Sequence, residues 1–154
     1  MQARNASGDN GVEFCSWQEI SELVSKIALE IRGKAAKKYD CILAIANGGI
    51  IPAKLLAEEL GIDRIILIPV LNKQVVEAEM PQLEAGKKYL VIDDIYDTGD
   101  IYQKVAKFMK GFDCTFVFCM SRYHQEFGAY GKLLNHGRWI VFPWEKAAAA
   151  GKHA

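Results

Sequence analysis

Apolar residues near the start of the chain recur every three or four positions, which is the spacing of one face of an α-helix. The apolar positions are Trp17, Ile20, Leu23, Val24, Ile27, Ala28 and Ile31. The sequence Ser16-Trp17-Gln18-Glu19 has the form of a capping box, and Gly33 closes the run. The pattern predicts an amphipathic helix that ends at Gly33.

Further along the chain, short apolar runs alternate with helical patterns. The runs predict strands at Cys41–Ala46, Ile65–Val70, Tyr89–Ile92, Thr115–Met120 and Trp139–Phe142. Helices are predicted from Pro52 to Gly61 and from Ile101 to Gly111. Such alternation predicts an α/β fold with a mostly parallel, twisted sheet flanked by helices. Because ligands of such sheets bind beyond the carboxyl ends of the strands, we expect function at the strand-to-helix turns.

The two ends of the chain differ in composition from the middle. Residues 1–11 are rich in Asn, Ser, Gly and Asp and are predicted to be disordered, and residues 146–154 form a low-complexity tail. A length of 154 residues suits one domain, which we place at residues 12–145. Within it, residues 71–86 are long and polar for a loop of a compact domain, which predicts a lid or a hairpin.

Charge and cysteine content narrow the function classes. The chain has 19 Lys plus Arg and 19 Asp plus Glu, and a net charge of zero does not favour a nucleic-acid or membrane-surface partner. Its four cysteines lie in apolar stretches without Cys-x-x-Cys spacing, which predicts buried thiols in a reducing compartment. Without a signal-peptide core or a run long enough to span a bilayer, the chain is predicted to be cytoplasmic.

The most informative segment follows the predicted strand at Tyr89–Ile92. Asp93, Asp94 and Asp97 crowd like charges there, which is unfavourable without a cation or hydrogen-bond donors. Mg²⁺ and sugar hydroxyls meet that need, and the backbone amides that follow, at a helix start, can bind a phosphate. The segment therefore suits a phosphorylated sugar. The alternative is a loop with Asp100 as the N-cap of the next helix, which accounts for only one of the aspartates.

The sequence from Val91 to Gly99 resembles the signature of type I phosphoribosyltransferases that binds 5-phosphoribosyl-1-pyrophosphate (PRPP). An Asp before Thr-Gly is typical of the family branch that acts on 6-oxopurines. The resemblance implies Mg²⁺-dependent transfer of a phosphoribosyl group from PRPP to guanine, xanthine or hypoxanthine, with release of pyrophosphate. It also implies the type I fold with a small hood and a flexible loop, and association as a homodimer or homotetramer.

The same resemblance implies roles for individual residues. Asp93 and Asp94 would face the ribose hydroxyls and the Mg²⁺, and Asp97 would be the acid/base near the imidazole ring of the purine. The residues implied to contact PRPP in this segment are Asp93, Asp94, Ile95, Tyr96, Asp97, Thr98, Gly99, Asp100 and Ile101. Ile101 departs from the family, which usually has a hydroxyl residue there, so one side-chain contact to the phosphate is lost.

Two further segments are implied to contact PRPP. Asn47 and Gly48 follow a predicted strand, and in the family this turn is the pyrophosphate loop, although Asn-Gly also forms ordinary turns. Relatives often carry a basic residue at the position of Asn47. Within residues 71–86, Lys73 and Gln74 are the candidates to reach the pyrophosphate. A solvated structural hairpin is the alternative for that segment.

An aromatic segment near the end of the domain is the candidate base pocket. Trp139 can stack on a planar base and the backbone of Ile140 can read its edge, although periodicity alone favours plain core packing. Trp-Ile followed by Pro-Trp and an acidic residue resembles the purine hood of bacterial xanthine-guanine phosphoribosyltransferases. Met120 stands where the family has a lysine that holds the 6-oxo group. Arg122, two residues on, is its candidate replacement or else an exposed loop charge.

Two other functions remain open on this sequence. A PRPP-sensing regulator of the same fold would keep the acidic segment but would not catalyse the transfer. The absence of the family lysine, and of the hydroxyl residue at the position of Ile101, favours such a regulator. The sequence offers no DNA-binding segment for such a regulator. The second alternative is a phosphoribosyltransferase for another base.

Overall fold

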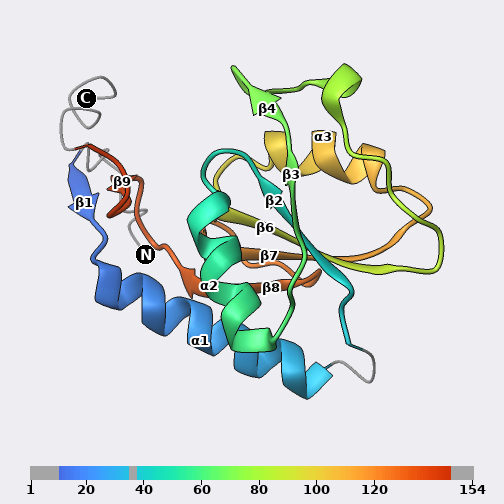
Figure 1. Ribbon diagram of the computed structural model, residues 1–154. Coiled ribbons are helices and arrows are strands. Elements are labelled where there is room, and N and C mark those ends of the chain that lie inside the picture. The colour runs from blue at the N-terminus through green and yellow to red at the C-terminus, as the bar shows by residue number, and fades with distance from the viewer. Residues whose placement is uncertain (1–10, 35–37, 147–154) are drawn as a thin grey trace, which may run out of the picture.

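A five-stranded parallel sheet forms the centre of the protein (Figure 1). The structure is a computed structural model and describes residues 11–34 and 38–146. The strands are β2 (Cys41–Ile45), β3 (Ile65–Ile68), β6 (Lys88–Tyr96), β7 (Asp113–Ser121) and β8 (Ala129–Leu133), in the order β3-β2-β6-β7-β8. All neighbouring strands pair in parallel, so the predicted fold class is confirmed.

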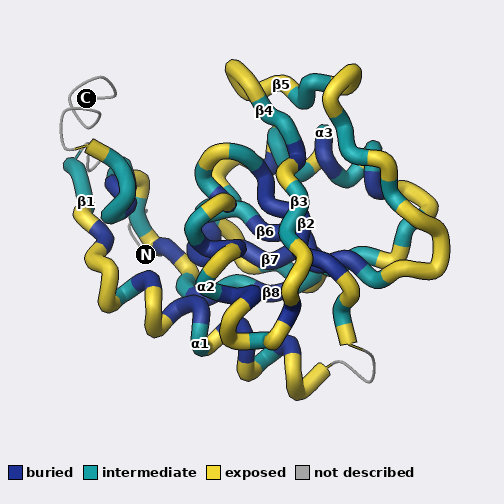
Figure 2. The backbone as a smooth tube through the Cα atoms, viewed as in Figure 1, coloured by how far each residue is buried: buried dark blue, intermediate teal, exposed yellow. Residues whose placement is uncertain are grey.

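Helices cover both faces of this sheet. Helices α1 (Trp17–Lys34) and α2 (Ile50–Leu60) pack on one face, and α3 (Asp100–Phe108) lies on the other (Figure 1). Because side chains of a strand alternate between faces, Leu90 of β6 contributes to the core under α1 and α2, and Val91 to the core under α3. The longest buried runs lie in the central strands β2, β6 and β7 (Figure 2).

Local sequence signals explain the first two helices. The Ser16 Oγ accepts a hydrogen bond from the Glu19 amide at 3.0 Å, as the capping box predicts. The Glu19 carboxylate binds Lys132 at 2.8 Å, and α1 ends one residue after Gly33, at Lys34. Helix α2 has Pro52 in its first turn and ends at Gly61, whose φ of 66° is the left-handed conformation of a C-cap.

The strand predicted at Trp139–Phe142 is confirmed, but it does not join the main sheet. Strand β9 (Trp139–Val141) pairs in parallel with β1 (Val12–Phe14) in a separate two-stranded sheet. The fifth strand of the main sheet is β8, which has a glycine and a lysine in its interior and little apolar periodicity to predict it. We call β1 and residues 134–145 the hood.

Strand β6 is longer than its apolar run predicted. It continues through Asp93 and Asp94 to Tyr96, in register with β7, where Ile95 is opposite Met120. The two aspartates therefore lie in the sheet and not in a turn. Because aspartate is unfavourable in strands, the prediction from local propensity ended this strand too early, at Ile92.

Residues 71–86 contain the hairpin that was one of the two predictions for this segment. Strands β4 (Val70–Leu71) and β5 (Gln74–Val75) are antiparallel, with Asn72 and Lys73 at φ of 49° and 58° in the turn, and the 3-10 helix η1 (Glu77–Glu79) follows. The predicted strand at Ile65–Val70 is split between β3 and β4 at Pro69, which has no N–H to donate.

The four cysteines are free thiols, as predicted. Cys15, Cys41 and Cys119 are buried, whereas Cys114 is half-buried. Among the helices of the described ranges, none has the length and hydrophobicity of a membrane span. The predicted disordered start and low-complexity tail lie outside the described residues, apart from Gly11 and Lys146.

Candidate functional site

Two neighbouring cavities lie at the carboxyl end of β6. The first measures about 190 Å³ and the second about 160 Å³, and both are lined by Asp94, Ile95 and Asp97. The first is otherwise lined by Asp93, Tyr96, Thr98, Gly99, Asp100, Ile101, Tyr102 and Phe118. The second is otherwise lined by Arg122, Trp139, Ile140, Phe142 and Glu145. The acidic segment therefore lies at the junction of the two cavities.

Asp93 and Asp94 are adjacent carboxylates at this junction. Their nearest donors are backbone amides: the Asp94 amide donates to Asp93 Oδ1 at 2.8 Å and the Ile95 amide to Asp94 Oδ1 at 2.7 Å. Burial, with the charge of Asp94, holds the pKa of Asp93 well above its usual range. Burial also raises the pKa of Asp94 to about 6, although hydrogen bonds from the Asp93 side chain and the Ile95 amide oppose the shift. A cation or a set of hydroxyl donors would stabilise the charged pair.

The glycine turn after β2 closes onto the same carboxylates. An ideal Cβ on Gly48 would lie 2.4 Å from Asp94 Oδ2, so only glycine allows the backbone to approach this closely. The Ala46–Asn47 peptide is cis, and Asn47 itself is exposed. Because β2 and β6 are neighbours in the sheet, their carboxyl ends bring the two predicted loops together.

The loop from Asp97 to Ile101 forms a cradle at the start of α3. Gly99 occupies the N-cap position with φ of 85° and brings no side-chain cap, and Thr98 Oγ1 accepts a hydrogen bond from the Asp100 amide at 3.3 Å. Asp100 is therefore the first helical residue, and the alternative that made it the N-cap was wrong. The Tyr96 Oη lies 2.4 Å from an ideal Cβ on Gly99, so the tyrosine packs under the loop. Such a helix start can bind a phosphate.

The second cavity combines the end of β7 with the hood. Arg122 Nε donates to Asp97 Oδ1 at 2.6 Å, and the Arg122 side chain is only 16% exposed. It is therefore not the exposed loop charge of the alternative interpretation. Trp139 and Ile140 of β9 line the same cavity.

Other predicted residues lie apart from the cavities. Met120 is fully buried in the core and, among the described residues, does not line the second cavity. Lys73 and Gln74 are exposed at the hairpin tip, and neither they nor Asn47 line either cavity.

Sequence reasoning missed two lining residues of the second cavity. Phe142 and Glu145 both face it, and the Phe142 amide donates to Glu145 Oε2 at 2.9 Å. The position of Glu145 directly after Pro143-Trp144, as in the resembling purine hood, was the signal that could have identified it. Phe142 had no distinct signal, because an apolar residue at a strand end is equally typical of a core.

Comparison with known proteins identifies the family. Residues 13–145 match the family model of the phosphoribosyl transferase domain, which is most of the chain. The chain belongs to this family. A xanthine-guanine phosphoribosyltransferase of Idiomarina loihiensis is 25% identical over 140 residues, which cover 86% of this chain and 86% of that protein.

Solved structures agree with this assignment. A purine phosphoribosyltransferase from Pyrococcus horikoshii superposes with a TM-score of 0.72 and 25% identity, covering 88% of this chain and 94% of that one. The xanthine-guanine-hypoxanthine phosphoribosyltransferase of Helicobacter pylori has a TM-score of 0.75 at 16% identity, covers 93% of this chain and 99% of its own, and supports the fold alone. The resemblance inferred from the acidic segment is confirmed, and the similar proteins are enzymes.

Proposed function

We propose that residues 12–145 transfer the phosphoribosyl group of PRPP to a 6-oxopurine base and release pyrophosphate. The observation that carries the proposal is the pair of cavities that meet at Asp97, one with a cradle for a sugar phosphate and one with aromatic walls for a base. The name of the Idiomarina relative supports guanine or xanthine as the base, and the name of the Pyrococcus structure supports a purine. Hypoxanthine is the third base that the family resemblance implies. As the family resemblance implies, we expect a homodimer or homotetramer, and we expect it in the cytoplasm, as the sequence predicts.

PRPP fits the first cavity by its chemistry. Its ribose hydroxyls would donate to Asp93 and Asp94, and the amides after Thr98 would bind its 5-phosphate. Its pyrophosphate would point toward Asn47 and Gly48. Lys73 and Gln74 would reach it by movement of the exposed hairpin.

The carboxylate pair also suits Mg²⁺. In the described ranges, no group of three or more His, Cys, Asp or Glu side chains could hold a metal by itself. Mg²⁺ commonly binds through one or two carboxylates together with substrate phosphates and water, and Asp93 and Asp94 supply such a pair. When bound, the ion supplies positive charge that stabilises the departing pyrophosphate.

The second cavity would hold the purine ring. Trp139 would stack on it, the backbone of Ile140 would contact its edge, and Met120 would lie in the core below. Arg122 has five N–H groups, of which three are used in hydrogen bonds to the protein. The remaining two can donate to a 6-oxo group, whereas the 6-amino group of adenine would bring a donor toward a donor.

The transfer breaks the bond from the ribose C1 to the pyrophosphate oxygen and forms a bond from C1 to a purine nitrogen. C1 gains positive character as the pyrophosphate leaves with the bonding electrons. Asp97 would take the proton that the base loses as the new bond forms. The protein would lower the barrier by stabilising the leaving group electrostatically and by excluding water under the hood.

Asp97→Asn tests this function. The variant keeps the shape and loses the basic carboxylate, so turnover should fall on the order of a hundredfold or more. We expect titration calorimetry with Mg²⁺ to show that PRPP still binds. Asp113→Asn, an exposed position at the opposite end of β7, is the matched control and should turn over normally.

The other possible outcomes would assign a different role to Asp97 or a different function to the protein. Near-normal turnover in Asp97→Asn would refute the acid/base role, and a parallel loss of PRPP affinity would make Asp97 structural. A wild-type protein that binds PRPP but transfers to no base would be the sensor. Activity on adenine, uracil or orotate, and not on 6-oxopurines, would identify a transferase for another base.

A further inference from the structure

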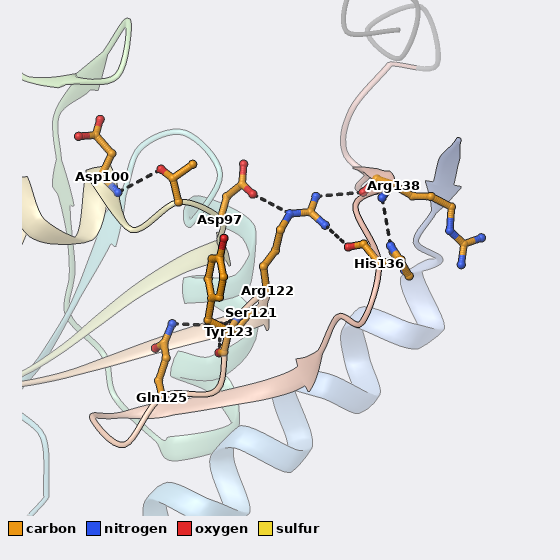
Figure 3. Close-up of polar contacts among 9 residues, drawn as sticks. Asp97, Asp100, Ser121, Arg122, Tyr123, Gln125, His136 and Arg138 are labelled. Atoms are coloured by element: carbon orange, nitrogen blue, oxygen red, sulfur yellow. Dashed lines mark hydrogen bonds and ion pairs between the residues drawn. The ribbon is translucent and has the colours of Figure 1, made fainter. Parts of the chain in front are cut away.

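Arg122 forms three hydrogen bonds that join two parts of the site (Figure 3). Its Nε donates to Asp97 Oδ1 at 2.6 Å, its Nη1 to the His136 carbonyl at 2.9 Å and its Nη2 to the Arg138 carbonyl at 2.9 Å. One planar group thus binds the proposed acid/base on one side and the hood backbone on the other. A lysine ammonium at this position could not span three acceptors spread in a plane.

The backbone that carries Arg122 is itself fixed. The Arg122 amide donates to the Tyr96 carbonyl at 3.0 Å, which continues the pairing of β7 with β6. Behind it, the fully buried Ser121 donates its hydroxyl to the Tyr123 carbonyl at 2.6 Å and accepts from Gln125 Nε2 at 3.0 Å. The guanidinium therefore extends from a turn whose backbone is held by several hydrogen bonds.

The hood segment is also held from its other side. Glu13 of β1 pairs with His136 Nε2 at 2.7 Å and with Arg138 Nη2 at 3.5 Å. Lys132 of β8 joins Glu13 at 3.4 Å and Glu19 at 2.8 Å. Residues 136–138 thus lie between Glu13 on one side and Arg122 on the other. A movement of this segment would break its contacts with one of them.

We propose that Arg122 is a positioning residue that holds Asp97 and the hood in a fixed relative geometry. The same side chain would then orient the acid/base and keep the hood over the base. This role rests on the proposed function and goes beyond a contact between Arg122 and the base. Without the guanidinium, the Asp97 carboxylate can rotate away from the base, and the His136 and Arg138 carbonyls lose the hydrogen bonds from Arg122. A displacement of about 1 Å at a reacting group can reduce a rate on the order of a hundredfold.

The proposal predicts that Arg122 acts through Asp97, which a double-mutant cycle measures. The cycle compares kcat of wild type, Arg122→Met, Asp97→Asn and the double variant. Arg122→Met should lower kcat on the order of 10- to 100-fold, with PRPP affinity unchanged by calorimetry. Once Asp97→Asn has removed the carboxylate, adding Arg122→Met should cause a smaller further loss than it causes in the wild type, because only the contacts of Arg122 with the hood and the base remain to be lost. Arg64→Met is the matched control. Arg64 is exposed, and its ion pair with Glu84 lies on the surface at the long distance of 3.7 Å.

Several outcomes would overturn this role. Normal kcat in Arg122→Met excludes it, and losses that multiply in the double variant show that Arg122 acts independently of Asp97. If Arg122→Met does not fold, as judged by its melting curve, the same cycle is measured with Arg122→Lys. A wild-type protein that binds PRPP without turnover removes the proposed function, and this role with it, before any variant is compared.

Discussion

Gly48 and Asp94 show how closely two segments of the site depend on one another at the level of single residues. The glycine backbone occupies the space beside the Asp94 carboxylate, where an ideal Cβ would lie 2.4 Å from an oxygen. Asp94 in turn lines both cavities. A change of one methyl group in the glycine turn should therefore be transmitted to the carboxylate that we assign to the ribose and Mg²⁺.

Gly48→Ala should weaken the binding of PRPP with Mg²⁺ on the order of tenfold or more, because overpacking by a methyl group typically costs about 1–3 kcal/mol. Titration calorimetry measures the change. Gly33→Ala is the control, since the added methyl in α1 would meet no described atom within 4 Å apart from its chain neighbours and the local helix backbone. It should raise the free energy of unfolding by about 0.5–1 kcal/mol and leave PRPP affinity unchanged. Equal PRPP affinity in both variants would contradict the assigned role of the turn.

At the scale of elements, the hairpin of β4 and β5 is tied to the phosphate cradle. Lys104 of α3 donates to the Lys73 carbonyl at 2.8 Å and pairs with Asp100 at 2.9 Å. Asp100 is the first residue of α3 and lines the first cavity. The tip residues Lys73 and Gln74 are exposed, and the Lys104 side chain connects this segment, proposed to reach the pyrophosphate, with the loop proposed to hold the 5-phosphate.

Lys104→Met should release the hairpin tip from α3. Loss of a hydrogen bond worth about 1 kcal/mol should speed amide hydrogen exchange in residues 70–75 on the order of fivefold. Mass spectrometry of the exchanged protein measures this, with Lys107→Met, an exposed lysine in the last turn of the same helix, as control. Unchanged protection of the hairpin in Lys104→Met would show that other contacts hold it.

At the scale of the whole molecule, the carboxylate pair makes stability depend on pH. The pKa of Asp94 is raised from 3.8 to about 6 by burial, so the folded protein keeps this proton over a range in which the unfolded chain releases it. The free energy of unfolding of the ligand-free protein should therefore fall as pH rises from 3.8 to about 6. Above that range, this group gives no further change.

Asp94→Asn should remove much of this decline and stabilise the ligand-free protein at pH 8 by on the order of 1–3 kcal/mol. Urea denaturation between pH 4 and pH 8 measures both effects. Asp63→Asn, at an exposed position after α2, should keep the decline of the wild type. A decline of the same size in Asp94→Asn would mean that other groups cause it.

Much of the fold follows from local sequence. The caps and apolar faces of α1 and α2 depend on neighbouring residues, and the alternation of strands with helices allows few arrangements other than a parallel sheet. The acidic segment and the glycine turn were recognisable for the same reason, because each places its chemistry within a few consecutive residues. Their meeting at one edge follows from the parallel order of β2 and β6.

Tertiary structure alone decided the remaining features. Strand β1 pairs with β9 across nearly the whole chain, and β8 joins the sheet with little periodicity of its own, because the edge of β7 offers hydrogen bonds that no local pattern reveals. The same holds for Arg122, whose sequence allowed either a pocket residue or a surface charge. Its three partners come from Asp97, His136 and Arg138, and only folding brings these acceptors into reach of one guanidinium.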